Sequence, residues 1–283
     1  MLDDLKNEDC RILAGGQSLV PMMAFRVAQP AHLIDINEIP DWGRIRLCGD
    51  ALVIDPQVRH AQFGHPTTPG PTGRLLAYVM RHIAHYPIRT RGTFCGSLAH
   101  SDPSSEWCLV ASTLGASVET KSADASRTIA ADDLSEGLMA TSLEANEMIV
   151  ATRLPLLPAD SHWGFYEFSR RPGDYAMAMS LVSYRLVDGL ITDARVGLGG
   201  AEAKARRISE AEDALNGHRP SEILYRSAAA AAAAVIEPME DLQADEASPT
   251  SRKGVETHPR KRPEWMQSRP CRLRYSASYR SVR

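Results

Sequence analysis

Short apolar runs separated by glycine, proline and polar clusters alternate with helix-like periodicity along most of the chain. The run at residues 11–14 is typical of a short buried strand, and residues 18–26 predict a short helix behind it. A second strand is predicted over residues 32–40. Alternation on both sides of Gly49-Asp50 predicts a β-hairpin, because this dipeptide favours a tight turn.

The middle of the chain alternates loops with short elements. Residues 57–72 are rich in Pro, Gly and Thr and predict a loop, and a helix is expected over residues 73–85. Residues 87–107 are a polar stretch that contains a second glycine-bearing loop. The run at 108–120 predicts the end of a helix followed by a strand, and residues 147–158 predict a strand that prolines terminate.

The C-terminal part predicts antiparallel strands over residues 164–201, with Asp188-Gly189 as a hairpin turn. Two helices should follow, one ending at Asn216-Gly217 and one from an N-cap serine at 221 to Pro238. The fold class is α+β. Pro155 and Pro158 place a boundary between a domain at 1–158 and a domain at 161–245.

Residues 246–283 differ from the rest in composition. They are basic, rich in Pro, Ser and Arg, and lack apolar periodicity, so they predict a disordered tail. The change is also what translation in a shifted reading frame would give. A nucleic-acid-binding arm is the alternative, but no other segment supports it, and we predict no nucleic-acid partner.

Bulk composition narrows the class of protein. The chain has 283 residues, 43% hydrophobic and 24% charged, with a net charge of −3, which is ordinary for a globular protein and gives no electrostatic footprint for nucleic acid. No apolar run approaches the roughly 20 residues of a membrane span. The acidic, polar N-terminus is unlike a targeting peptide, so a cytoplasmic location is expected.

Metal and disulfide chemistry have little support in the sequence. The five cysteines form no Cys-x-x-Cys pair, which argues against a disulfide framework, a zinc site or an iron–sulfur cluster. His82 and His85 are three residues apart, a spacing that helices use for metals, but no companion ligand lies nearby. We therefore interpret them as ordinary histidines at a helix end and predict no metal site.

Two glycine loops carry the candidate chemistry. Glycines at the tip of a strand, as in "AGGQS" at residues 14–18, let backbone N–H groups converge on an anion, and Ser18 adds a hydroxyl. A tight turn without a ligand is the alternative. The loop "RGTFCGS" at residues 91–97 repeats the chemistry, so a diphosphate held from two sides is predicted. Neither loop has the spacing of a Rossmann fingerprint or a P-loop.

The two loops and their surroundings resemble a known family. "ILAGGQSLVPMMAFRVAQPAHLIDINEIP" and "YPIRTRGTFCGSLAHSDPSSEW" are similar, at the right separation, to the FAD-binding medium subunit of bacterial molybdenum hydroxylases. This family includes carbon monoxide dehydrogenase and enzymes that hydroxylate aromatic N-heterocycles. "FYEFSRRPGDYAMA" resembles the strand that begins the family's C-terminal domain, and the resemblance covers residues 8–245.

The resemblance implies a fold and a set of cofactor contacts. The fold would be a two-lobed FAD-binding domain of the vanillyl-alcohol-oxidase (PCMH) type, followed by a C-terminal domain of antiparallel strands packed with helices. The alternative to flavin contact for Tyr166 is packing in the core, and for Asp102 and Glu106 it is capping of the helix that follows. The implied FAD contacts are Ala14, Gly15, Gly16, Gln17 and Ser18 in the first loop, Thr93, Phe94, Cys95, Gly96 and Ser97 in the second, and Glu106, Ile149 and Tyr166 near the flavin ring.

The implied function is electron transfer within an oxidoreductase complex. Molybdopterin and 2Fe–2S clusters would reside on a large and a small partner subunit, in a dimer of heterotrimers, and FAD on this chain would pass their electrons to an external acceptor. The overall reaction would oxidise or hydroxylate a small molecule such as an aromatic N-heterocycle, an aldehyde or CO. No catalytic acid–base residue is therefore expected here, and the adjacent Ser, His and Asp of "AHSDPSS" are a poor triad.

The sequence departs from the family pattern at three places. Members of the family have about one further strand and helix before the first glycine loop, whereas this chain begins inside that helix. The basic tail stands where the family has a final helix. Cys95 stands where relatives carry glycine. If that position requires positive φ or close phosphate approach, a Cβ there costs about 1 kcal/mol, and Cys95→Gly should tighten FAD retention.

Two other functions remain open at this point. One is a stand-alone FAD oxidoreductase of the same fold, such as the reductase of cell-wall precursor synthesis, which would need substrate-binding and proton-donating residues in the C-terminal domain. The other is a flavin-free assembly subunit. Flavin content distinguishes the flavin-free assembly subunit from both flavoprotein hypotheses. Co-purification with partner subunits distinguishes the electron-transfer subunit from the stand-alone oxidoreductase.

Overall fold

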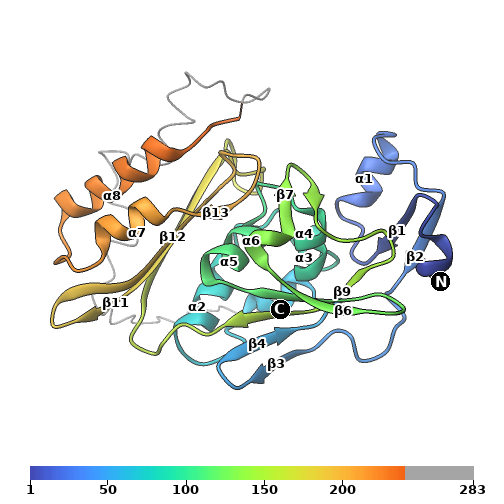
Figure 1. Cartoon of the computed structure of the whole chain (residues 1–283), viewed down its shortest axis with the longest axis horizontal. Coiled ribbons are helices and arrows are strands. Elements are labelled where there is room, and N and C mark those ends of the chain that lie inside the picture. Colours follow the sequence, from blue (N-terminus) through green and yellow to red (C-terminus); the bar gives the residue numbers. More distant parts are fainter. Residues whose placement is uncertain (240–283) are drawn as a thin grey trace, which may run out of the picture.

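Three main groups of strands and one small hairpin organise the chain in the computed structural model, which describes residues 1–239 (Figure 1). The predicted tail at 246–283 and the end of the predicted second domain lie outside the described residues. The first group is a small parallel pair, β1 (Cys10–Leu13) and β2 (His32–Asp35), after a short 3₁₀ turn, η1 (Asp3–Leu5). Helix α1 (Leu19–Ala24) is the crossover between the two strands. Because the pair is parallel, both strands end at the same edge.

The central group is a five-stranded antiparallel sheet in the order β3-β4-β9-β5-β6. Its second strand, β4, is buried at every position, as expected for a strand covered on both faces. The strands are β3 (Ile45–Cys48), β4 (Ala51–Ile54), β9 (Met148–Pro155), β5 (Ser117–Lys121) and β6 (Ser126–Ala130).

Short helices cover this sheet and enclose the main core. Three aromatic side chains are fully buried there: Trp107, Phe63 and Phe94. The ring centroid of Trp107 lies 4.9 Å from that of Phe63 and 5.0 Å from that of Phe94. The helical elements are η2 (His60–Gly64), α2 (Gly70–Val79), α3 (Tyr86–Arg89), α4 (Phe94–His100), α5 (Glu106–Leu114) and α6 (Ala131–Leu134), and a small hairpin follows, β7 (Ser135–Gly137) and β8 (Ala140–Thr141).

The third group is an antiparallel sheet in the order β10-β11-β12-β13. Two helices pack on it around a second core, with α7 contacting β12 and α8 contacting α7. In Figure 1, helix α5 lies between this sheet and the central sheet. The elements are β10 (His162–Phe168), β11 (Ala178–Val187), β12 (Leu190–Gly199), β13 (Arg206–Arg207), α7 (Ser209–Leu215) and α8 (Glu222–Val235).

Most predicted elements are present, and two predictions need correction. The glycine-bearing loop predicted at 91–97 extends only to Thr93, because helix α4 begins at Phe94, and α3 and the first turn of α5 lie in the same polar stretch 87–107. The helix predicted over 73–85 is α2, which begins at Gly70 and ends at Val79. Pro71 stands in its first turn, where a missing N–H costs nothing, so a proline that suggested a loop belongs to the helix.

Candidate functional site

The two glycine loops touch each other through their backbones. A Cβ on Gly15 would lie 2.4 Å from the carbonyl oxygen of Arg91 and 2.7 Å from Cα of Gly92, so no side chain fits there. Arg91 and Gly92 are the first two residues of the second loop, 91–97. The structure therefore brings residues 14–18 against the start of the second loop, although the two loops lie far apart in the sequence.

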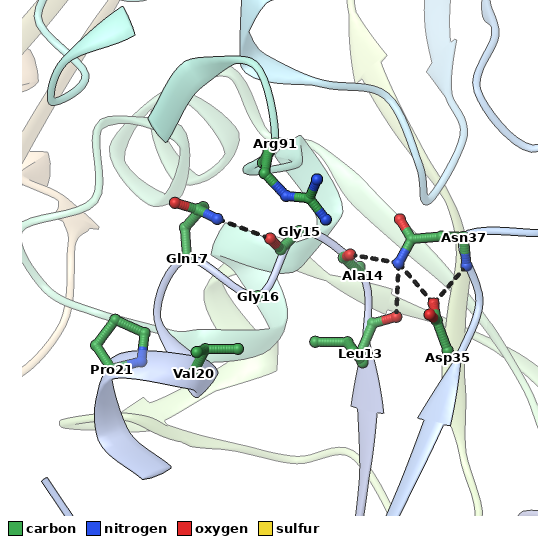
Figure 2. A pocket seen from close by; sticks show the side chains of 10 residues that line it. All are labelled: Leu13, Ala14, Gly15, Gly16, Gln17, Val20, Pro21, Asp35, Asn37 and Arg91. Atoms are coloured by element: carbon green, nitrogen blue, oxygen red, sulfur yellow. Dashed lines mark hydrogen bonds between the residues drawn. The ribbon is translucent and has the colours of Figure 1, made fainter. Parts of the chain in front are cut away.

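A cavity of about 340 Å³ opens beside this contact (Figure 2). It lies where β1 and β2 end, so the shared edge of the parallel pair forms one wall and α1 another. Gly16 has a φ of +70°, a conformation that favours glycine, and this turns the chain from β1 toward α1. The lining residues are Leu13, Ala14, Gly15, Gly16, Gln17, Val20, Pro21, Asp35, Asn37 and Arg91.

A polar network fixes the walls of the cavity. The side-chain amide of Asn37 donates to the carbonyl oxygen of Ala14 at 2.8 Å and to Asp35 at 2.6 Å. The backbone N–H of Asn37 also donates to Asp35, and these bonds hold the pKa of the Asp35 carboxyl below its usual range. Arg59 donates to the side-chain oxygen of Asn37 at 2.5 Å and to the carbonyl oxygen of Arg91.

Arg91 gives the cavity a positive charge. Its exposed guanidinium makes no hydrogen bond or ion pair within residues 1–239, although its charge acts on Asp35. In Figure 2 the Arg91 side chain lies between Gly15 and Asn37. The cavity thus combines an ionised carboxylate with an arginine available to a ligand, and arginine binds phosphate oxygens well.

The second loop begins helix α4. Thr93 is the N-cap, and its hydroxyl oxygen accepts the backbone N–H of Gly96 at 3.0 Å. A Cβ on Gly96 would lie 2.5 Å from that oxygen, so glycine is required. Thr93 keeps its hydroxyl hydrogen as a possible donor to a ligand. Gln17, in the first loop, folds back and donates to the carbonyl oxygen of Gly15 at 3.0 Å.

The expected backbone strain at Cys95 is wrong. Cys95 lies in the first turn of α4 and is not among the residues with positive φ. Its side chain is 3% exposed, and Sγ lies 3.3 Å from the hydroxyl oxygen of Thr152 in the central sheet. Burial raises the pKa of the thiol to about 12. Only the backbone of Cys95 is available to a ligand, because its Cβ points into the core.

The other predicted contacts are spread around the site. Phe94 is fully buried in the aromatic core, so it too can offer only its backbone, whereas Ser97 is half-buried. Ile149 is a core residue of β9, 5% exposed. Tyr166 on β10 is 45% exposed, so the alternative of core packing is wrong for it. None of these four lines the cavity in Figure 2.

Glu106 stands at the first position of α5, behind the N-cap Ser105, whose hydroxyl oxygen accepts the N–H of Cys108. The capping alternative for Glu106 is therefore wrong, and Asp102 instead accepts the N–H of Ser104 at 2.8 Å. Burial, and then the charge of Glu167, raise the pKa of Glu106 to about 8. Besides Asp35, whose pKa is lowered, the molecule thus has a carboxyl with a raised pKa, that of Glu106, at the start of α5.

Four residues in or next to the cavity were not predicted from the sequence: Asp35, Asn37, Arg59 and Arg91. Asp35 and Asn37 lie at and just after the end of β2, which pairs in parallel with β1. Their position could have identified them, because ligands often bind beyond the ends of parallel strands. Arg91 stood inside the quoted second loop. Arg59 gave no signal, since its contacts come from distant segments.

His82 and His85 lie just beyond α2. The ring of His82 packs against Phe165 with centroids 5.0 Å apart, and its Nδ1 lies 3.8 Å from Glu167. His85 is the N-cap of α3. The described residues contain no group of three or more His, Cys, Asp or Glu arranged for a metal ion, and none of their helices is long and apolar enough to cross a membrane.

The fold and the paired glycine loops define a flavoprotein with a FAD-binding domain and a C-terminal strand domain. Residues 1–157 match the family described as FAD binding domain in molybdopterin dehydrogenase, and residues 163–247 match the CO dehydrogenase flavoprotein C-terminal domain. The chain belongs to the family of FAD-binding medium subunits of molybdenum hydroxylases, and it is an oxidoreductase subunit.

Named relatives agree with this assignment. The nicotine 6-hydroxylase medium subunit of Paenarthrobacter nicotinovorans is 42% identical over 236 residues, 83% of each chain. The carbon monoxide dehydrogenase medium chain of Hydrogenophaga pseudoflava is 34% identical over 84% of this chain and 83% of its own.

Two solved structures share the fold. Carbon monoxide dehydrogenase from Hydrogenophaga pseudoflava superposes with a TM-score of 0.85 at 34% identity, covering 90% of this chain and 89% of that one. Quinoline 2-oxidoreductase from Pseudomonas putida 86 gives a TM-score of 0.81 at 34% identity with the same coverage. These relatives favour the medium-subunit function over the stand-alone reductase.

Proposed function

We propose that residues 14–18 and 93–97 hold the diphosphate of FAD from two sides. The observation that carries this proposal is the backbone contact between Gly15 and Arg91-Gly92, which joins the two loops next to a cavity of about 340 Å³. That volume lies at the lower end of the range for small-molecule sites and suits part of a dinucleotide.

The charges of the site fit this ligand. Arg91, which lines the cavity, would donate to phosphate oxygens. The N–H of Cys95, in the first turn of α4, makes no backbone hydrogen bond within residues 1–239 and would be a further donor. The ionised Asp35 would repel a phosphate and accept hydrogen bonds from sugar hydroxyls. Ser18 makes no cap bond to α1, so its hydroxyl is available as well.

The role of this chain is to bind and orient the cofactor. FAD, when bound, supplies the exchange of electrons, singly or in pairs, between iron–sulfur clusters on a partner and an external acceptor. Residues 14–18, Arg91 and 93–97 would hold the diphosphate. Glu106, Ile149 and Tyr166 are proposed to lie toward the flavin ring, and no residue of this chain is assigned a catalytic proton transfer.

We propose that the chain works in a larger assembly. Homologues are named as subunits of multi-subunit dehydrogenases, which supports partner subunits. The partners would be a large molybdopterin subunit and a small 2Fe–2S subunit, in a cytoplasmic dimer of heterotrimers. Relatives are named for nicotine, caffeine and carbon monoxide, so the substrate would be a small molecule oxidised on another chain. Within this chain, 1–158 and 161–245 would form the two domains.

Titration of the flavin-free full chain with FAD tests the binding proposal. We expect saturable binding with quenching of flavin fluorescence, and loss of most affinity in Gly15→Ala, because its Cβ would meet the backbone of Arg91. Gly43→Ala is the matched control, since nothing lies within 4 Å of its Cβ. A folded chain that ignores FAD, or Gly15→Ala with wild-type affinity, contradicts the proposal.

A further inference from the structure

A short segment behind the cavity pairs with the second glycine loop. The N–H of His60 donates to the carbonyl oxygen of Gly92 at 2.9 Å, and the N–H of Phe94 donates to that of Val58 at 3.0 Å. Arg59 and Thr93 form the bridge between these two bonds. Residues 58–60 therefore fix the path of the backbone at the point where the second loop begins.

The side chain of Arg59 joins this segment to the first loop. Its guanidinium donates to the carbonyl oxygen of Arg91 and, at 2.5 Å, to the side-chain oxygen of Asn37. Asn37 in turn donates to the carbonyl oxygen of Ala14 at 2.8 Å. One planar guanidinium thus connects the backbone at the start of the second loop with the residue that holds the first loop, a geometry that a lysine cannot reproduce.

The side chain of His60 holds the second loop from inside the core. The indole N–H of Trp107 donates to Nδ1 of His60 at 2.9 Å, and His60 is 5% exposed. An indole nitrogen can only donate, so Nδ1 must be the acceptor and the neutral ring carries its proton on Nε2. The edge of the ring lies against Gly92, where an added Cβ would be 2.5 Å from Nε2.

We propose that Arg59 and His60 are positioning residues that set the separation of the two glycine loops and thereby the affinity for FAD. Neither side chain lines the cavity, so both act through Arg91, Gly92 and Asn37. His60 performs this role in the tautomer with the proton on Nε2. This inference rests on the proposed FAD site.

The test measures the Kd for FAD and the thermal midpoint of the full chain in the same set of variants. Arg59→Met keeps the apolar stem but loses both hydrogen bonds, and we expect the Kd to rise about tenfold with a small change in midpoint. His60→Ala should raise the Kd by at least as much. His60→Gln should recover part of the affinity, because its amide oxygen can accept from Trp107. Exposed His65→Gln is the control.

A spectroscopic measurement tests the tautomer assigned to His60, which the thermal midpoint does not report. Nitrogen-15 spectra of histidine-labelled chain should show one buried ring protonated on Nε2 only, a signal absent from His60→Gln. A wild-type Kd in Arg59→Met, or a ring protonated on Nδ1, overturns the inference. If His60→Ala fails to fold, Arg59→Met and His60→Gln still decide. A wild-type chain that binds no FAD refutes the proposed function instead.

Discussion

At the scale of single residues, opposite charges share one small cavity. Asp35 is held ionised by hydrogen bonds from Asn37, and Arg91 has a guanidinium with no ion-pair partner in the described chain. A ligand that carries both phosphates and sugar hydroxyls satisfies both groups, whereas a simple anion would leave Asp35 opposed to it. We therefore predict that the site prefers a nucleotide-like ligand to inorganic phosphate.

Cys95 leads to the first prediction. Because the side chain is buried and helical, Cys95→Gly removes packing and adds backbone freedom, and we expect a loss of about 1–2 kcal/mol in the free energy of unfolding. FAD affinity should not increase. Cys95→Ser, which retains a polar contact to Thr152, is the matched variant for denaturant unfolding. Tighter FAD binding in Cys95→Gly would restore the idea of strain at this position.

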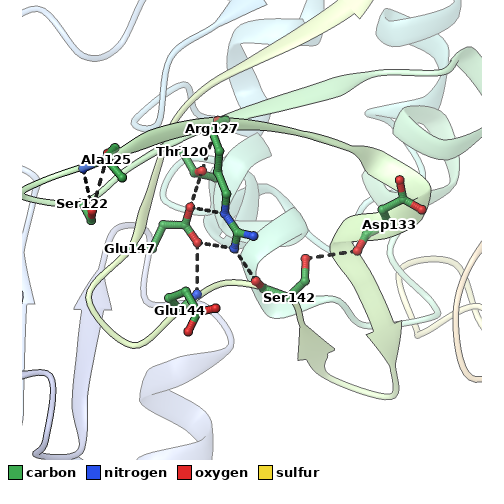
Figure 3. Close-up of polar contacts among 8 residues, drawn as sticks. All are labelled: Thr120, Ser122, Ala125, Arg127, Asp133, Ser142, Glu144 and Glu147. Carbon is green, nitrogen blue, oxygen red and sulfur yellow. Dashed lines mark hydrogen bonds and ion pairs between the residues drawn. The ribbon is translucent and has the colours of Figure 1, made fainter.

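Glu147 leads to a pH-dependent prediction (Figure 3). Arg127 donates to both carboxylate oxygens of Glu147 at 2.6 Å, and Thr120 and the N–H of Glu144 donate as well. The hydrogen bonds from Arg127, with those from Thr120 and Glu144, lower the pKa of Glu147 to about 2 against the opposing effect of burial. Since its usual pKa is 4.5, the stabilisation is complete above about pH 4.5 and is lost as the pH falls toward 2.

The variant for this prediction is Arg127→Met. It leaves a carboxylate that is 8% exposed without its partner, and near neutral pH we expect a loss of roughly 2 kcal/mol. In thermal melts, the difference in midpoint between Arg127→Met and wild type should become smaller below pH 4.5. Arg226→Met, which breaks an exposed pair with Glu222, should change little. A gap that stays constant down to pH 3 would show that the ion pair does not cause it.

At the scale of elements, helix α5 is held directly against strand β12. A Cβ on Gly197 would lie 1.8 Å from the hydroxyl oxygen of Thr113 and 2.9 Å from Leu109, so the strand has no room for a side chain there. Arg195 also donates to the carbonyl oxygen of Leu114 at the end of α5. Since α5 begins beside the second glycine loop, this contact ties the C-terminal sheet to the site.

We predict that Gly197→Ala destabilises the protein by about 1–3 kcal/mol through overpacking, measured by thermal unfolding. Thr113→Ala removes the clashing oxygen and should restore part of the loss in the double variant. Gly64→Ala is the control, because its nearest neighbour would be an ordinary contact at 3.6 Å. Equal midpoints for Gly197→Ala and Gly64→Ala would contradict the close packing of α5 on β12.

Elements with local signals were predictable from the sequence. Asp188 and Gly189 both have positive φ, as their hairpin turn requires, and Ser221 caps α8 by accepting the N–H of Leu224. Helix α4 was missed because its glycine and polar residues are typical of loops, and its start depends on pairing with residues 58–60. The two glycine loops were predicted from their composition. Arg59 was not, since its contacts join three segments distant in sequence.

At the scale of the whole molecule, the loop between α4 and α5 connects the FAD-binding part to the C-terminal sheet. Pro103 accepts the N–H of Gly200 at 2.8 Å, and the hydroxyl of Ser104 donates to the carbonyl oxygen of Ala176 at 2.8 Å. The second glycine loop, α5 and the sheet of β10–β13 are thus one continuous arrangement (Figure 1). Cofactor binding at the loops is therefore expected to stabilise both parts of the chain together.

Both glycine loops are proposed to hold FAD. Hydrogen exchange of the full chain, followed by mass spectrometry with and without saturating FAD, tests this proposal most directly. We expect slower exchange in peptides that contain residues 14–18 and 93–97 when FAD is added, with the β3–β4 hairpin tip at Gly49-Asp50 unchanged as the internal control. Saturable FAD binding that leaves exchange in either loop unaltered would contradict binding of FAD by both loops.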